Sequence, residues 1–129
     1  MTPELTVLSL ALLLAIAQLF LFAVPANRDI GTRYLAGPRD EGVKLEGRTA
    51  RLQRAFQNHI EGLALFTPAA LVVAVSGQST AFTAACAWAY LLARVVYVPA
   101  YAYGWAPWRS AIWAVGLLAT VLMLLAALF

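Results

Sequence analysis

Residues 5–24 read LTVLSLALLLAIAQLFLFAV, a run of twenty residues without one charged side chain. At about 1.5 Å per residue, a helix of this length crosses a hydrocarbon layer about 30 Å thick. Glu4 rather than a basic residue precedes the run, and the run is longer than the apolar part of a secretory signal. We therefore expect a retained membrane-spanning helix, ended by Pro25, rather than a cleaved leader.

Composition extends this expectation to the whole chain. Of its 129 residues, 63% are hydrophobic and only 12% are charged, whereas about a quarter of the residues in a soluble domain are charged. Further apolar stretches cover 63–75, 81–103 and 111–129. So short a chain cannot enclose this much apolar surface in one core, so much of it must face lipid. We predict an all-α integral membrane protein, a four-transmembrane-helix bundle forming a single domain over 1–129. The expected helices cover about 4–26, 48–76, 80–103 and 108–129.

Basic residues indicate the orientation of this bundle. Seven of the nine lie between the first helix and the apolar part of the second: Arg28, Arg33, Arg39, Lys44, Arg48, Arg51 and Arg54. The positive-inside rule then places the loop over about 27–47 in the cytoplasm and both termini outside. Because Asp29, Asp40, Glu41 and Glu46 offset the loop's positive charge, nucleic acid is not an expected partner.

Polar residues inside the second helix mark a candidate site. At about 100° per residue, Arg54, Asn58 and Glu61 point within about 60° of one another, with Arg51 at the edge of their stripe. Glu61 lies about 15 Å below Arg51 along the helix. A charge at that depth needs a partner or a water-filled cavity, because an isolated charge in hydrocarbon is costly.

The third helix carries a matching stripe of Tyr90, Arg94, Tyr97 and Tyr101. Arg94 and Glu61 lie at similar depths, so we predict an ion pair between them. The two stripes either hold the bundle together or, with Arg109, line a site that opens to the cytoplasm and suits an anionic ligand with a lipid-soluble companion. His59 has no acidic or cysteine neighbour at metal-ligand spacing, so we expect a structural or interfacial role and no metal site.

Three segments together resemble the signature motifs of one protein family. They are RLQRAFQNHIE at 51–61, RVVYVPAY at 94–101 and APWRS at 106–110. This pattern is similar to that of the MAPEG superfamily, the membrane-associated proteins in eicosanoid and glutathione metabolism. The GPRDE loop at 37–41 resembles that of bacterial members. The resemblance implies a homotrimer in the bacterial inner membrane, with glutathione as co-substrate held between subunits near the cytoplasmic face.

The resemblance also implies roles for individual residues. Arg109 corresponds to the arginine that stabilises the glutathione thiolate and is the candidate catalytic residue. The candidate substrate-binding residues are Arg51, Arg54, Asn58, Glu61, Arg94, Tyr97 and Tyr101. The second substrate would be a lipophilic small molecule that enters from the membrane lipid. Two positions depart from the family pattern: Phe56 stands where relatives often carry glutamine or histidine, and Gly62 replaces an aromatic residue found in some relatives.

Three functions are consistent with these residues. The favoured one is a microsomal-type glutathione-dependent transferase or peroxidase acting on lipophilic electrophiles or hydroperoxides. The second is a non-catalytic lipid-binding or scaffold protein of the same fold, which the changes at Phe56 and Gly62 favour. The third is a small multidrug transporter, which is disfavoured because Glu4 lies at the outer end of the first helix.

Overall fold

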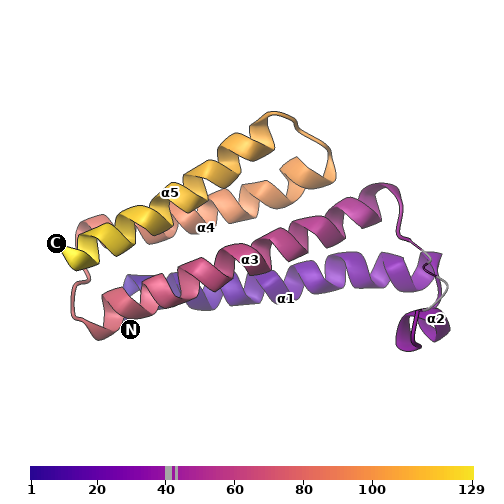
Figure 1. Ribbon diagram of the computed structural model, residues 1–129, viewed down its shortest axis with the longest axis horizontal. Coiled ribbons are helices and arrows are strands. Elements are labelled where there is room, and N and C mark those ends of the chain that lie inside the picture. The colour runs from indigo at the N-terminus through magenta and orange to yellow at the C-terminus, as the bar shows by residue number, and fades with distance from the viewer. Residues whose placement is uncertain (40–41, 43) are drawn as a thin grey trace.

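The computed structural model describes residues 1–39, 42 and 44–129, and the secondary structure of this part is entirely helical (Figure 1). Its elements are α1 (Pro3–Asp29), α2 (Thr32–Ala36), α3 (Gly47–Val75), α4 (Ala81–Ala102) and α5 (Trp108–Leu128). The four long helices are each long and apolar enough to cross a membrane. The predicted four-helix membrane fold is therefore confirmed.

The four long helices are arranged as two pairs, α1 with α3 and α4 with α5 (Figure 1). The pairs meet where α3 packs against α4 and α5 and where α1 packs against α4. Both termini lie at one end of the bundle together with the α3–α4 turn, which we call the terminal end. The opposite end holds the end of α1, the short helix α2, the start of α3 and the connection 103–107, and we call it the loop end. Segments 51–61 and 94–109, which carry the candidate site, therefore approach each other in the half of the bundle nearer the loop end.

The first helix differs from its prediction, because α1 does not end at Pro25 but continues to Asp29. A proline inside a helix removes one backbone donor, yet membrane helices tolerate this loss. Beyond the proline the helix still has side-chain support, since Asn27 Nδ2 donates to the Ala23 carbonyl at 2.8 Å. The predicted loop is also shorter than expected and contains α2; its residues Asp40, Glu41 and Val43 lie outside the described residues.

Small residues allow the helices to pack closely. Ala11, Ala55, Ala70 and Ala87 are fully buried between helices, while leucine and phenylalanine side chains of α1 are exposed on the outside. Without a hydrophobic driving force between helices, close backbone packing is a principal source of association in lipid. The exposed apolar surface of the helices suits contact with lipid, in agreement with the composition.

A buried carboxylate fastens the terminal end. Glu4 at the start of α1 is fully buried and accepts hydrogen bonds from the hydroxyl groups of Ser79 and Thr83 at the start of α4. Ser79 Oγ lies 3.0 and 2.9 Å from the two carboxylate oxygens. Glu4 is thus a contact between helices and lies at the opposite end of the bundle from the candidate site.

Candidate functional site

A cationic cluster, which we define as Arg54, Tyr101 and Arg109, lies at the loop end. α3 supplies Arg54, the last turn of α4 supplies Tyr101, and the first turn of α5 supplies Arg109. Arg54 Nε donates to the Tyr101 hydroxyl at 3.2 Å, and Arg109 Cζ lies 4.6 Å from the centre of the Tyr101 ring. Arg54 is exposed and Arg109 is partly exposed. Two cations from different helices thus share one aromatic side chain in a position open to ligand.

Arg51 lies beside this cluster but has a different partner. Its Nη1 donates to the Ala102 carbonyl at 3.0 Å. This carbonyl belongs to the last turn of α4, where backbone acceptors have no partner within the helix. Arg51 therefore caps α4 and holds its end against α3, although it is also a candidate substrate-binding residue.

A second group, the Arg94 network, lies deeper and consists of Asn58, His59, Arg94 and Tyr97. Arg94 is only 3% exposed. It donates from Nε to His59 Nδ1 at 3.2 Å and from Nη1 to Asn58 Oδ1 at 2.9 Å. Its Cζ also lies 4.6 Å from the centre of the Tyr97 ring. The desolvated guanidinium is thus surrounded by acceptors and an aromatic face.

The hydrogen bonds of His59 determine its tautomer. A guanidinium has no acceptor, so His59 Nδ1 must accept from Arg94 and the proton must be on Nε2. His59 Nε2 then donates to the Ala11 carbonyl of α1 at 2.9 Å. The neutral imidazole consequently links α1 to Arg94 of α4 through α3. His59 has the structural role expected from the sequence, but the pattern did not indicate that Arg94 is its partner.

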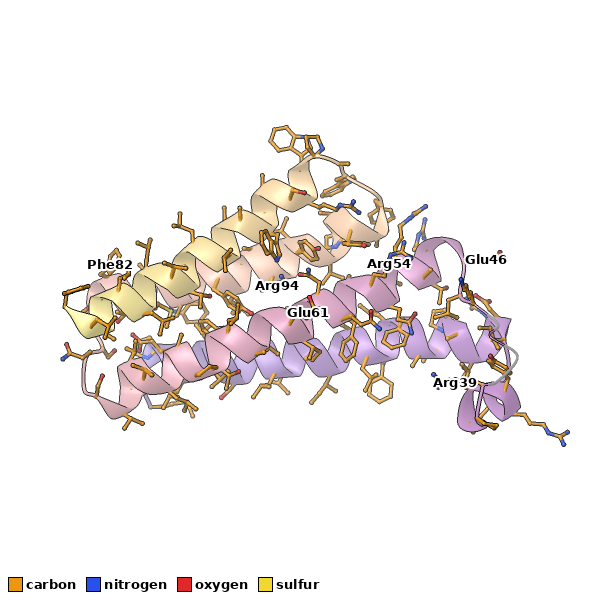
Figure 2. All side chains as sticks on the ribbon, viewed as in Figure 1. Arg39, Glu46, Arg54, Glu61, Phe82 and Arg94 are labelled. Carbon is orange, nitrogen blue, oxygen red and sulfur yellow. The ribbon has the colours of Figure 1, made fainter. Side chains whose placement is uncertain are left out.

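The predicted ion pair between Glu61 and Arg94 is wrong: among the described residues, Arg94 has no carboxylate within ion-pair distance. Helix geometry explains the difference. A Cβ added at Gly62 would lie 3.8 Å from Arg94 Nη1, so Gly62 and Asn58, four residues apart, form the face of α3 nearest Arg94. Glu61, about 100° away from Gly62, is exposed instead. Figure 2 shows Glu61 and Arg94 near the middle of the bundle and Arg54 nearer the loop end.

A cavity of about 180 Å³ lies beside Arg94 between α3, α4 and α5. Its lining residues include the charged Glu61 and Arg94 and the polar Tyr90. The remaining lining residues are Asn58, Gly62, Leu65, Trp113, Gly116, Leu117 and Thr120. The cavity is therefore partly polar, although it lies at the level of the membrane interior.

The structure thus divides the predicted site residues into two groups. Arg51, Arg54, Tyr101 and Arg109 come together at the loop end, while Asn58, Arg94 and Tyr97 come together below them with Glu61 at the cavity wall. The rings of Tyr97 and Tyr101, with centres 5.7 Å apart, connect the groups. Among the described residues, no group of three or more His, Cys, Asp or Glu side chains could hold a metal ion.

Comparison with family models gives a match over residues 7–129 to the model described as the MAPEG family. The chain belongs to the MAPEG family. It is accordingly an integral multi-pass membrane protein related to glutathione and eicosanoid metabolism. No curated protein and no solved structure matches the chain.

The two departures from the MAPEG pattern have structural explanations. A Cβ at Gly62 would lie 3.2 Å from the Tyr90 hydroxyl, so a larger residue there requires Tyr90 to move. Phe56 packs against Phe22 of α1, with ring centres 5.5 Å apart. Position 56 therefore strengthens the α1–α3 contact, and position 62 makes room for the hydroxyl group of Tyr90.

Proposed function

We propose that this MAPEG protein is a glutathione-dependent transferase or peroxidase that acts on lipophilic electrophiles or hydroperoxides. The observation that carries the proposal is the cationic cluster. Within the described part of the chain, neither Arg54 nor Arg109 makes an ion pair, and both contact the accessible Tyr101 side chain. Unneutralised cations at a partly exposed position suit a ligand that brings its own negative charges.

Glutathione carries two carboxylates and a thiol. The cluster offers one arginine for a carboxylate and a second arginine for the thiol. Arg54 can bind a carboxylate through its planar fork of N–H donors. Arg109 supplies a fixed positive charge, and a nearby cation lowers a thiol pKa from its usual value of about 8.5. More of the glutathione is then thiolate at neutral pH, which makes it a better nucleophile.

The thiolate can react in two ways. In transfer, its sulfur attacks an electrophilic carbon, a carbon–sulfur bond forms, and the leaving group departs with the electron pair. In peroxide reduction, two glutathione molecules are oxidised to one disulfide, and the hydroperoxide is reduced to an alcohol and water. Both reactions need a lipophilic second substrate, which reaches the site from the lipid.

The same proposal includes a homotrimer in the bacterial inner membrane, with the loop end in the cytoplasm. Support comes from the basic residues at the loop end and from polar residues exposed on α3. Gln57 and Glu61 are exposed although they lie within a candidate membrane span. A polar surface on a membrane helix is costly in contact with lipid, and a neighbouring subunit would cover it.

A lipid-binding or scaffold protein without catalysis is the second candidate. The contact between Phe56 and Phe22 favours it, because position 56 offers no polar group to glutathione. On this alternative the Arg94 network still holds the helices together, but the cationic cluster forms no thiolate.

The deciding experiment compares glutathione with S-methylglutathione, which has no ionisable thiol. We expect the protein in lipid nanodiscs to give an ultraviolet thiolate difference band with glutathione. Arg109→Ala should abolish the band and weaken glutathione binding about tenfold, the equivalent of one pKa unit, while binding of S-methylglutathione changes little. Arg48→Ala is the matched control. Arg48 is an exposed cation at the loop end, in the first turn of α3, and it contacts Tyr103 rather than Tyr101.

Two results would contradict the proposal. If the unmodified protein gives no thiolate band and calorimetry detects no glutathione binding, the lipid-binding alternative is favoured. If Arg109→Ala weakens both ligands equally and retains the band, Arg109 binds the peptide and another group stabilises the thiolate.

A further inference from the structure

A basic pocket lies at the loop end beside the cationic cluster, with which it shares Arg54. It has a volume of about 290 Å³ and is formed by the end of α1, the short helix α2, the residues before α3 and the first two turns of α3. We call it the loop pocket. Its lining residues include three cations, Arg39, Lys44 and Arg54, and the uncharged polar Tyr34 and Gln53. Three cations around one space favour an anionic ligand.

Arg39 is fixed at the edge of this pocket, beside α2 (Figure 2). Its φ angle is 61°, in the left-handed region that residues other than glycine rarely adopt. The Tyr34 hydroxyl donates to the Arg39 carbonyl at 3.1 Å, and Arg39 Nε donates to the Leu35 carbonyl at 2.9 Å. Such a backbone conformation persists only where surrounding contacts maintain it. The two terminal nitrogens of Arg39 meanwhile have no acceptor among the described residues.

Lys44 is the second open cation of the loop pocket. It is exposed and forms neither a hydrogen bond nor an ion pair with a described residue. Segment 28–54 carries seven basic and four acidic residues, so its net charge is +3 even with Asp40 and Glu41, which lie outside the described residues, included. Arg39 and Lys44 therefore face one pocket in a segment whose own acids cannot neutralise all of its cations.

The apolar part of the loop pocket indicates that the anion belongs to a lipid. Ile30, Leu35 and Leu45 line the pocket together with the cations, and all three are half-buried. The pocket also lies where the membrane-spanning helix α1 ends, since Ile30 is the residue that caps it. A soluble phosphate compound would gain little from apolar walls at this position. The glycerol and first acyl carbons of a phospholipid would lie against them.

A phosphate diester suits the two cations chemically. A guanidinium binds phosphate oxygens through parallel N–H donors, and a lysine ammonium binds them as a point charge. A zwitterionic headgroup would add an ammonium that Arg39 and Lys44 repel, whereas an anionic headgroup keeps its net negative charge. The volume of about 290 Å³ is far above the roughly 10–15 Å³ that one water molecule requires, so a headgroup has room.

From these contacts we propose that the loop pocket binds the phosphate group of an anionic phospholipid, with Arg39 and Lys44 as the recognising cations. The bound lipid holds the segment between α1 and α3 at the membrane surface. This inference goes beyond the proposed function and does not depend on glutathione chemistry, because neither cation belongs to the cationic cluster.

The test titrates the protein in neutral detergent micelles with phosphatidylglycerol or phosphatidylcholine of identical acyl chains, and native mass spectrometry measures the bound lipid. We expect the unmodified protein to bind phosphatidylglycerol more tightly than phosphatidylcholine. Arg39→Gln and Lys44→Gln should each reduce the affinity for phosphatidylglycerol about fivefold, the usual contribution of one basic residue at an anionic surface. Arg39→Lys keeps the charge and should retain most of the preference.

Arg48→Gln is the matched control. Arg48 is an exposed cation in the first turn of α3 that does not line the loop pocket, so its loss should leave the affinity for phosphatidylglycerol unchanged. The inference is overturned if the unmodified protein binds the two lipids equally. It is also overturned if Arg48→Gln weakens phosphatidylglycerol as much as Arg39→Gln does, because net charge rather than the pocket then attracts the lipid.

Two further titrations distinguish the lipid from other anions. If soluble glycerol phosphate binds as tightly as phosphatidylglycerol, the pocket takes a soluble phosphate compound and the lipid assignment is wrong. If Arg39→Gln and Lys44→Gln weaken glutathione as much as phosphatidylglycerol, the pocket is an extension of the glutathione site through Arg54 and the inference fails. A protein that forms no thiolate yet prefers phosphatidylglycerol would contradict only the catalytic proposal.

Discussion

Arg94 and Arg109 are both arginines on membrane helices of one bundle, but their surroundings differ. Arg94 is enclosed, with two side-chain acceptors and the Tyr97 ring around its guanidinium. Arg109 is partly exposed, and its guanidinium lies over the Tyr101 ring. A desolvated cation with satisfied donors stabilises a fold, whereas an open cation remains available to a ligand. Burial and partners, rather than residue type, therefore distinguish an arginine that holds helices together from one that is open to a ligand.

The largest expected effect is the loss of the enclosed Arg94 side chain. Arg94→Ala should lower the free energy of unfolding by about 3 kcal/mol, because it leaves acceptors on the buried His59 and the half-buried Asn58 unpaired and opens space between the helices. Arg109→Ala should lower it by no more than about 0.5 kcal/mol. Equilibrium unfolding in mixed micelles measures both values.

Equal losses of unfolding free energy in Arg94→Ala and Arg109→Ala would contradict this difference between the two arginines. That result would mean that Arg109 is needed for packing of α5, or that water in the cavity satisfies the groups left by Arg94. Equal losses would therefore remove the structural distinction on which the two roles depend.

A smaller effect is expected at His59, which connects the Arg94 network to α1. His59→Ala removes the donor to Ala11 and the acceptor for Arg94 Nε, and should cost about 2 kcal/mol of unfolding free energy. Arg48→Ala, at an exposed position of the same helix near the loop end, should change stability little. In a double-mutant cycle, His59→Ala and Arg94→Ala should couple by at least about 0.5 kcal/mol, since their side chains are in contact. Additive losses would show that the hydrogen bond contributes nothing.

The sequence predicted the membrane bundle well because that prediction depended on simple quantities. Long apolar runs must be helical in lipid, since every backbone group needs a partner within its own segment. The end of α1 was less predictable, because Pro25 disfavours a helix but does not prevent one where a side chain such as Asn27 supports the next turn. The short helix α2 carries no comparable apolar signal.

The candidate site was predictable as a set of residues but not as a set of contacts. Helical spacing brought Arg54, Asn58 and Glu61 to one side of α3, yet two charges at similar depth were not sufficient to form an ion pair. The face of α3 nearest Arg94 is determined by the small Gly62 and by the rotation of each helix, which hydrophobicity alone does not specify. His59, directly after Asn58, was the available signal for the actual partner of Arg94. Glutathione binding and the catalytic role of Arg109 remain predictions.

The smallest expected effect is the loss of the Tyr101 hydroxyl group from the cationic cluster. Tyr101→Phe keeps an aromatic face for Arg109 but removes the hydroxyl group that accepts from Arg54 Nε. Without that bond, Arg54 should hold a glutathione carboxylate less precisely. Because Arg54 is exposed and the effect is indirect, we expect affinity to fall only about threefold, or less than 1 kcal/mol. The thiolate band should persist, because the phenylalanine ring still supports the Arg109 guanidinium. Calorimetry and the difference spectrum on one sample measure both quantities. Loss of the band with unchanged affinity would instead show that the Tyr101 hydroxyl group stabilises the thiolate. Tyr101 would then have the role that we propose for Arg109.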